Sequence, residues 1–517
     1  MKRRSIYRVL AAVLLLGAVL LLWACEEKEE FTFEINESGG AVLTGYHGKG
    51  GDVVVPYTYD GIPVVGVDSF AFVYKQSVTS VTLPETVEYI GQYAFVGSSE
   101  LRTVTLTSDK ISIGEGAFSN CRGLEEITLN GCESIPKWAF KNCSSLVNID
   151  VSGITEIGYG AFSGCAKLES FDIPDTVKRL DSCVFEGCVS LRSVRIGNSV
   201  TVIGEKCFNK VPATVTFGES PSLSSVTAGM FAGCVGDRIE IPASVTSIKG
   251  GAFDRCSAKI DFADGISIDV TYKMFLGYVG ERIELPAGVK RIESGAFRGI
   301  AAEVIFADDG ALISIESRAF EDYLGESIAL PDSVTYVGEG AFDGCEADVF
   351  FGEESKLANL GARAFEDWLG EKITLPVGLK YIGDGAFLGC SNLLEIVIPD
   401  GVSYISTDAF NQCYRLKNAD LGNVKTISEG AFFGCSSLAS IVIPDSVEKI
   451  DDAAFGGCDV LSYVSLGSNV RYIGMQAFGE CPLLMDINYA GSEADWKNVE
   501  LYNGAEAIGY ASVIFEK

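Results

Sequence analysis

The chain has 517 residues, of which 70 are acidic and 40 basic, and its formal net charge is −30 at pH 7. This balance argues against nucleic acid as a partner, because phosphate binding requires clustered Lys and Arg. It also argues against docking on an anionic lipid surface. His47 is the single histidine, so a catalytic triad could form only around it, and a zinc site with two histidines is excluded. We therefore expect no catalysis, no cofactor and no metal site.

The first thirty residues have the pattern of an export signal. Four basic residues among the first eight precede an unbroken apolar run over 9–24. This run is shorter than the roughly 20 residues of a membrane span and is typical of a signal peptide. It ends in Leu22-Trp23-Ala24-Cys25, which resembles a bacterial lipobox, where the Cys is lipidated and becomes the mature N-terminus. We predict a signal peptide over 1–24, lipidation of Cys25 and a linker over 25–30; the alternatives are an ordinary signal peptide or an uncleaved anchor.

A single repeat occupies most of the remaining chain. A Phe, usually preceded by Ala, recurs at intervals of 22 or 23 residues, and a Val, Ile or Leu stands five residues before each one. The positions of this repeat Phe are 72, 95, 118, 140, 162, 185, 208, 231, 253, 275, 297, 320, 342, 365, 387, 410, 432, 455 and 478. Self-similarity with this period indicates a solenoid rather than several separate globular domains.

Each repeat predicts one strand and one tight turn. Segments such as Leu124–Leu129 alternate apolar and polar residues, as in a half-buried strand. The following Gly-x-Gly-Ala-Phe segment suits a close-packed turn of helix. Because a unit of 22 residues cannot bury its own apolar face, neighbouring units must stack. We predict an α/β-type leucine-rich repeat solenoid of about 19 coils, with one continuous parallel sheet.

The repeat resembles the BspA-type leucine-rich repeat. The residues that carry the resemblance lie in 157–174, IGYGAFSGCAKLESFDIP, and similar segments follow in nearly every coil. The resemblance extends over a lead-in, 31–66, and a closing segment, 490–517, which we interpret as caps of a solenoid over 67–489. Similar proteins are exposed on the surface of bacteria or protists, and several are adhesins that bind host matrix proteins or other microbes. The resemblance implies no catalytic residues.

Twelve of the 16 cysteines stand three residues after a repeat Phe, at 121, 143, 165, 188, 234, 256, 345, 390, 413, 435, 458 and 481. One cysteine per coil at the same position predicts a row of buried free thiols that donate weakly to backbone carbonyls. Scattered disulfides and a metal site remain alternatives, although the chain has no Cys-x-x-Cys pair. The row does not account for Cys132, Cys183 and Cys207.

Paired acids raise the hypothesis of a glycosidase, since two carboxylates at a suitable separation suffice for that chemistry. Examples are Asp308-Asp309, Glu353-Glu354 and Asp451-Asp452. With 70 acidic residues such pairs arise by chance, and a regular solenoid offers no enclosed pocket. We interpret these acids, and His47 in the N-terminal cap, as polar surface.

The outward residues of the predicted strands suggest where a partner binds. They are mostly polar early in the chain and turn apolar over a stretch of neighbouring coils, which predicts an exposed patch bordered by charged residues that include Lys372. The candidate positions are Ile305, Ala329, Phe350, Thr374 and Val397. In the same region the repeats alternate with a period of 44 or 45 residues, as expected if a block of two coils was duplicated. The alternatives are an error in the assigned strand register, or a cover over these residues by a loop or a second molecule.

Together these features predict an extracytoplasmic, membrane-anchored bacterial lipoprotein, placed at the cell surface. Its expected function is non-catalytic adhesion to an extracellular protein or glycan ligand, with membrane anchoring through the N-terminal lipid only and no nucleic-acid partner. The alternative is a structural spacer or envelope-assembly protein without a dedicated host ligand. The sequence leaves the ligand and the oligomeric state open.

Overall fold

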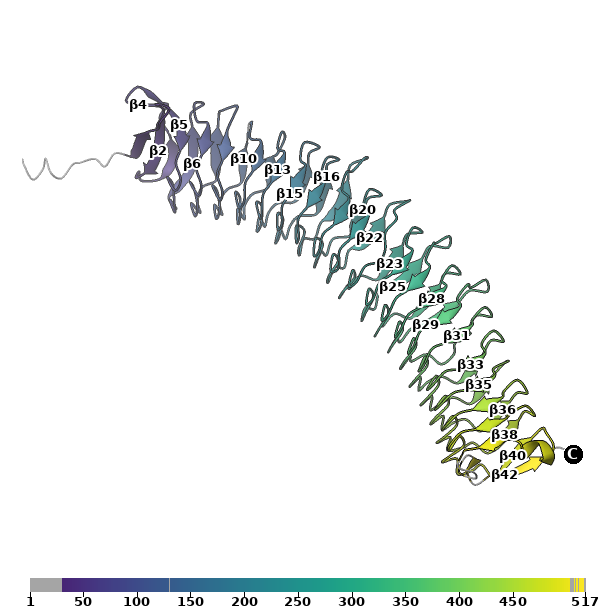
Figure 1. Ribbon diagram of the computed structural model, residues 1–517. Helices are drawn as coiled ribbons and strands as arrows, with labels where there is room; N and C mark the ends of the chain where they lie inside the picture. Colours follow the sequence, from purple (N-terminus) through teal and green to yellow (C-terminus); the bar gives the residue numbers. More distant parts are fainter. Residues whose placement is uncertain (1–29, 130, 503–505, 507, 510, 516–517) are drawn as a thin grey trace, which may run out of the picture. The chain divides into compact units, whose positions relative to one another are not determined.

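The structure is a computed structural model that describes residues 30–129, 131–502, 506, 508–509 and 511–515. The predicted signal peptide and Cys25 lie outside the described residues. The chain divides into two compact units: residues up to 154 with 161–167 form unit 1, and 155–160 with 168 onwards form unit 2. In each unit the strands succeed one another in chain order (Figure 1).

Unit 1 begins with the antiparallel hairpin of β1 (Phe31–Ile35) and β2 (Ala41–Tyr46), beside which β4 (Thr58–Tyr59) pairs with β5 (Ile62–Val67). Parallel coils follow, and their strands form two rows. The first row holds β3 (Gly51–Val54), β6 (Val78–Leu83), β8 (Thr103–Leu106), β10 (Glu126–Thr128) and β12 (Asn148–Asp150). The second row continues from β5 into β7 (Tyr89–Ile90) and β9 (Ser112–Ile113), and β11 (Ser134–Ile135) lies in the next coil.

Unit 2 has the same two rows. Its first row holds β14 (Ser170–Ile173), β16 (Ser193–Ile196), β18 (Thr214–Phe217), β20 (Arg238–Ile241), β22 (Lys259–Phe262), β23 (Arg282–Leu285), β25 (Glu303–Phe306), β27 (Ser327–Leu330), β29 (Asp348–Phe351), β32 (Glu395–Val397), β34 (Asn418–Asp420), β36 (Ser440–Ile443), β38 (Tyr463–Leu466), β40 (Asp486–Tyr489) and β42 (Ser512–Phe515). Its second row holds β13 (Glu156–Ile157), β15 (Arg179–Leu180), β17 (Val202–Ile203), β19 (Ser225–Val226), β21 (Ser247–Ile248), β24 (Arg291–Ile292), β26 (Ser314–Ile315), β28 (Tyr336–Val337), β30 (Asn359–Leu360), β31 (Tyr381–Ile382), β33 (Tyr404–Ile405), β35 (Thr426–Ile427), β37 (Lys449–Ile450), β39 (Tyr472–Ile473) and β41 (Glu500–Leu501).

The predicted parallel leucine-rich repeat solenoid is confirmed, with two differences. The strands form two rows instead of one, because in most coils the Val, Ile or Leu five residues before the repeat Phe ends a second strand of two residues. Within the described residues the only α-helix is α2 (Glu493–Trp496), whose N-terminus is capped by Ser492 through a capping box with Asp495. Among these same residues, no helix has the length and apolar character needed to cross a membrane.

The segment around each repeat Phe is a stacked turn, not the expected turn of helix. The residue two positions before the Phe and the residue two positions after it have positive φ, for example Gly340 (58°) and Gly344 (62°) around Phe342. A right-handed helix cannot contain such residues. The same positions are held by non-glycine residues in other coils, for example Arg363 (φ 55°) and Asp367 (φ 53°). This conformation accounts for part of the glycine excess.

The repeat Phe side chains form a continuous stack within each unit. In unit 1 the ring centroids of Phe72 and Phe95 are 4.7 Å apart with an interplanar angle of 13°. In unit 2 Phe410, Phe432 and Phe455 stack at 5.2 Å, and all three are fully buried. The backbone joins the same coils, since the Phe432 N–H donates to the carbonyl of Ala454 in the next coil at 2.7 Å. Rings and hydrogen bonds therefore fix neighbouring coils in one register.

In most coils the position three residues after the repeat Phe carries a buried hydrogen-bond donor. The Cys121 thiol donates to the Phe95 carbonyl of the preceding coil at 3.1 Å, and the Ser98 hydroxyl donates to the Phe72 carbonyl at 2.7 Å. In the alternating coils Trp368 takes this position and donates its indole N–H to the Ala347 carbonyl at 2.8 Å. All fifteen cysteines of the described residues are buried with free thiols, which agrees with the predicted row.

The cysteines outside the row have structural positions of their own. Cys183 holds the left-handed position two residues before Phe185, with φ of 60°, and Cys207 replaces the Ala before Phe208. The Cys132 thiol donates to the carbonyl of Ser134 at 3.0 Å within a turn. Burial raises the pKa of several row thiols, to about 12 for Cys121 and Cys345, and keeps these thiols protonated.

Stacking also brings like charges together. The position after the repeat Phe carries Glu321, Asp343 and Glu366 in three consecutive coils. Glu321 is paired with Arg298 at 3.1 Å, and Glu366 with Arg363 at 2.9 Å. Burial, followed by the charges of Glu366 and Glu321, raises the pKa of the middle carboxyl, Asp343, from 3.8 to about 6. The folded state therefore holds this proton more tightly than the unfolded state.

The Phe stack yields the first prediction. Phe432→Ala should lower the free energy of unfolding by roughly 3–5 kcal/mol, because it opens a cavity between two rings. Phe433→Ala, which truncates the adjacent side chain with 36% exposure, should have a much smaller effect. Urea denaturation of both variants measures the difference. Equal losses of unfolding free energy in the two variants would show that a stacked Phe contributes no more to stability than a surface Phe.

The carboxyl of Asp343 yields the second prediction. Because its pKa is higher in the folded state, its contribution to stability is present below about pH 4 and is lost as the pH rises through 6. Asp343→Asn should remove this dependence, so that the variant gains in melting temperature over the wild type between pH 4 and pH 7. Asp459→Asn, at an exposed acid, is the control. Parallel pH profiles of Asp343→Asn and wild type would contradict the assignment.

Candidate functional site

On each first-row strand of unit 2, alternate side chains point outward and together form one exposed face. In β27 and β29 burial alternates along the strand, so that Ile328 and Val349 point inward while Ala329 and Phe350 are exposed. The two strands pair in parallel register, and Ala329 lies opposite Phe350. Because every coil repeats this alternation, the outward positions of successive strands line up in a row across the coils.

The structure places the predicted patch on this face with two differences. Phe350 is 55% exposed and Val397 is 60% exposed. Ala329 and Thr374 are exposed as well, but both are small, and Thr374 belongs to a coil whose outward segment forms only a single bridge, from Lys372 to Glu395. Ile305, opposite Glu284, is only half-exposed. The large exposed apolar groups are therefore Phe350 and Val397.

The charged border of the patch is also present. Lys372 Nζ lies 2.7 Å from Glu395 Oε1 in the next coil, in the row adjacent to Thr374 and Val397. The hydrogen bond to Glu395 raises the pKa of Lys372. Both side chains are exposed, so the pair contributes little to stability, and its ions are available to a partner.

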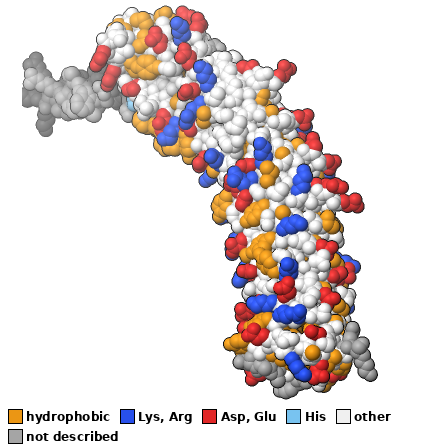
Figure 2. Space-filling model, turned by 45° about the vertical axis from the view of Figure 1, so that its right-hand side comes forward, with side chains coloured by type: hydrophobic (Ala, Val, Ile, Leu, Met, Phe, Trp, Pro, Cys, Tyr) orange, Lys and Arg blue, Asp and Glu red, His pale blue; other side chains and the backbone are white. Residues whose placement is uncertain are grey.

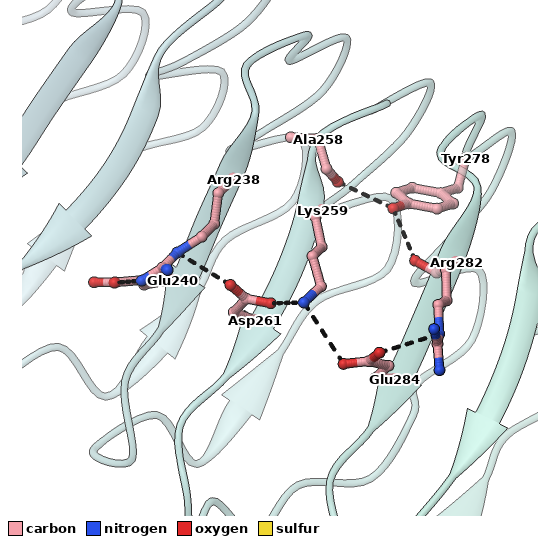
Figure 3. A network of polar contacts seen from close by, with 8 residues as sticks. All are labelled: Arg238, Glu240, Ala258, Lys259, Asp261, Tyr278, Arg282 and Glu284. Carbon is pink, nitrogen blue, oxygen red and sulfur yellow. Dashed lines mark hydrogen bonds and ion pairs between the residues drawn. The ribbon is translucent and has the colours of Figure 1, made fainter.

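Before the patch, the outward face carries a ladder of ion pairs on β20, β22 and β23 (Figure 3). Asp261 bridges two cations, with Arg238 Nε at 3.0 Å from its Oδ2 and Lys259 Nζ at 2.9 Å from its Oδ1. Glu284 in the next coil bridges Lys259 Nζ at 3.7 Å and Arg282 Nε at 3.0 Å. Basic residues thus form one row across the three coils and acidic residues a parallel row, and each of these carboxylates bridges the cations of two coils.

The ladder continues at both ends. Arg238 is also paired with Glu240 on its own strand, and Arg282 Nε lies 3.9 Å from Glu303 Oε2 on β25. The hydrogen bond from Lys259 to Asp261 raises the pKa of that lysine. Each pair is weak in water, but side chains held by two partners have fewer rotamers to lose when a ligand binds. In Figure 2 such basic and acidic side chains intersperse with hydrophobic ones on the visible face.

The backbone below the ladder is fixed from the interior. The Tyr278 hydroxyl lies 3.0 Å from the carbonyl oxygen of Ala258 and 3.3 Å from that of Arg282 (Figure 3). Tyr278 replaces the row cysteine in a coil with a short connection that lacks the buried Leu of other coils, such as Leu438. The aromatic side chain therefore fills the interior and holds the start of β23.

The sequence interpretation missed a second apolar row. One residue beyond the buried donor, every second coil from that of Phe185 to that of Phe410 exposes a large apolar side chain. Its members are Val189, Val235, Val279, Leu324, Leu369 and Tyr414, with exposed fractions between 42% and 67%. The spacing of two coils, already visible in the alternating repeats, was the signal that could have identified it.

The structure gives the other candidate groups ordinary surroundings. His47 is exposed. Asp451 is paired with Lys449 at 2.6 Å, and Asp452 accepts a hydrogen bond from the Met475 N–H at 2.8 Å. Asp308 and Asp309 are exposed on a loop. No cluster of three or more potential metal ligands occurs among the described residues. The arrangement supports binding by an extended face.

Several solved structures are similar to this chain at low sequence identity. A leucine rich cell surface protein from Faecalibacterium prausnitzii is 23% identical over 92% of this chain and 96% of its own, with a TM-score of 0.33. A leucine-rich repeat protein from Bacteroides ovatus is 21% identical over 95% and 99%, with a TM-score of 0.30. The pneumococcal vaccine antigen PcpA is 16% identical over 95% and 98%, with a TM-score of 0.24. No curated protein matches the chain significantly.

The family comparison covers most of the chain. The model of the BspA type leucine rich repeat region, which spans six copies, matches residues 66–191, 147–261, 268–368, 313–435 and 358–485. These overlapping matches leave only the two ends and 262–267 uncovered. The same segments form the stacked coils described above. The chain therefore belongs to the BspA type leucine-rich repeat family.

Proposed function

We propose that the chain is a non-catalytic binding protein of the bacterial cell surface, which uses the outward face of its first strand row to hold an extracellular protein or glycan. The observation that carries this proposal is the exposure of Phe350 and Val397 on coils two apart, on either side of the coil of Thr374, next to an ion pair that is already ordered. An exposed apolar centre with a charged border is typical of an interaction surface.

The proposal includes export and lipid anchoring at Cys25. The supporting observation is the sequence alone, in which a basic segment, an apolar run and Leu22-Trp23-Ala24-Cys25 follow in the order of a lipoprotein signal. A single lipid at the N-terminus leaves both strand rows free to meet partners. The alternative function is a spacer or envelope-assembly protein, for which no saturable ligand is expected.

Phe350→Asp tests the proposed face. The substitution should weaken binding at least tenfold, because a charge in the apolar centre of an interface must be desolvated without a partner. It should leave the melting temperature nearly unchanged, because the side chain is more than half exposed. Binding of the mature protein to a panel of immobilised matrix proteins and cell-wall polysaccharides provides the measurement.

Val54→Asp is the matched control, since Val54 is 69% exposed on the first row of unit 1. It introduces the same charge far from the candidate patch in the sequence and should bind as the wild type does. Unchanged binding by Phe350→Asp would reject the face. An absence of saturable binding across the whole panel would favour the spacer function.

Cys25→Ala tests the anchor. The wild type should incorporate radiolabelled palmitate and fractionate with membranes, whereas the variant should do neither, because it lacks the thiol that carries the lipid. Label that persists in Cys25→Ala would contradict lipidation at this residue. The buried thiols, such as Cys143, provide no alternative acceptor in the folded protein.

A further inference from the structure

A second surface of unit 2 lies at the carboxyl ends of the first-row strands. Here two kinds of connection alternate from coil to coil. Five residues follow β20, β23 and β27 before the second row begins, and each of these connections starts with a Pro. Seven residues follow β18, β25 and β29, and the connection after β22 reaches the second row only at Val270. Long loops therefore alternate with short turns along this edge.

The strands before the long loops also end differently. Their last residue is Phe217, Phe262, Phe306 or Phe351, whereas strands before short turns end in Ile241, Leu285 or Leu330. The aliphatic residues are buried, but the four Phe side chains remain partly exposed. An acidic residue follows each Phe after one small residue, at Glu219, Asp264, Asp308 and Glu353. Each long loop thus presents an aromatic side chain together with a carboxylate.

The alternation creates pockets between the long loops. One pocket of 490 Å³ is lined by the loop after Phe217, the short turn at Pro242 and the loop after Phe262. The next, of 530 Å³, is lined by the loop after Phe262, the short turn at Pro286 and the loop that contains Asp309. The two pockets share Phe262 and Asp264, so they are consecutive members of a row.

The lining of both pockets is mainly acidic, and the basic Arg238 that lines the first pocket is paired with Glu240 and Asp261. Four acidic residues and no basic residue line the second pocket: Asp261, Asp264, Glu284 and Asp309. Asp261 and Glu284 are engaged in the ion-pair ladder. For the exposed Asp264 and Asp309, the described residues supply no ion pair and no side-chain hydrogen bond. A Lys or Arg side chain entering the pocket would meet these carboxylates and the ring of Phe262, both of which attract cations.

The spacing of the pockets selects the shape of the ligand. Strands of neighbouring coils are about 4.8 Å apart, so pockets two coils apart repeat at about 9.6 Å. A polyproline II chain rises about 3.1 Å per residue, and its side chains return to the same side after three residues, about 9.3 Å. We propose that this edge binds an extended basic peptide that has Arg or Lys at every third residue. The proposal shares with the proposed function only the premise of a binding protein, because these pockets lie at the edge of the strand face in other coils than Phe350 and Val397.

Two synthetic peptides test the proposal with the mature full-length protein. One repeats Arg-Pro-Pro four times, and the other has the same composition with its four Arg residues adjacent. Fluorescence anisotropy should show at least tenfold tighter binding of the first peptide, because only its charges match the pocket spacing. Its affinity should fall as salt is raised, since exposed charges are screened. Equal affinity for the two peptides would overturn the proposal and indicate attraction to net charge alone.

The variant Asp264→Asn/Asp309→Asn should weaken binding of the Arg-Pro-Pro peptide at least tenfold. The control, Glu125→Gln/Glu126→Gln, removes two exposed negative charges in unit 1 and should change the affinity less than twofold. Phe262→Leu should weaken binding several-fold, and it should fold because Leu285 holds the same strand position in the next coil. Equal effects of the two double variants would reject the pockets.

Phe350→Asp separates this proposal from the proposed function. Phe350→Asp should leave the affinity for the peptide unchanged. Asp264→Asn/Asp309→Asn should leave unchanged the affinity for any ligand that binds to the outward strand face. A neutral β-linked oligosaccharide is the competing occupant, since aromatic rings and carboxylates also bind sugars. Both the oligosaccharide and free arginine are tested as competitors of the bound peptide. If the oligosaccharide displaces the peptide at a lower concentration than free arginine does, the assignment to a basic peptide is overturned.

Discussion

The structure depends on the match between one coil and the next. In each coil the phenyl ring must stack on the ring of the next coil, and the backbone groups must align for hydrogen bonds between the coils. Phe432, whose N–H donates to the carbonyl of Ala454, is an example. A coil of 22 or 23 residues has no core of its own, so all its apolar burial comes from this contact. The left-handed residues on both sides of the Phe, the small residue before it and the donor three residues after it all serve the same contact.

Stacking has a consequence for the surface, because any residue type placed at one position is repeated at coil distance. Two strand positions of opposite charge, repeated from coil to coil, form the ladder of Arg238, Asp261 and Lys259, whereas burial together with like charges repeated at one position raises the pKa of Asp343. Where the coils alternate, positions repeat at twice the distance. The pockets beside Phe262 arise in this way. Departures from the simple repeat are therefore the places where the surface forms features, such as these pockets, that a uniform repeat would not provide.

The two proposed surfaces differ in the physical basis of binding. The outward strand face offers apolar area at Phe350 and Val397, with charges at its margin that are already paired. The carboxyl-end edge offers Asp264 and Asp309, exposed carboxylates beside an aromatic ring. The first suits a ligand that buries hydrophobic surface, and its affinity would depend weakly on salt. The second suits a cationic ligand, whose affinity would fall with salt.

The sequence by itself determined the period, the parallel solenoid, the row of buried thiols and the outward position of Phe350. These follow from a repeat Phe at fixed spacing and from the alternation of strand side chains, both of which are local patterns. Only the tertiary structure decided that the Phe segment is a left-handed turn, that the strands form two rows, and that Ile305 is half-buried. It also decided that loops after Phe217 and Phe262 enclose pockets. The reason is that turn conformation, burial and pocket lining depend on the coils on either side, which no single repeat contains.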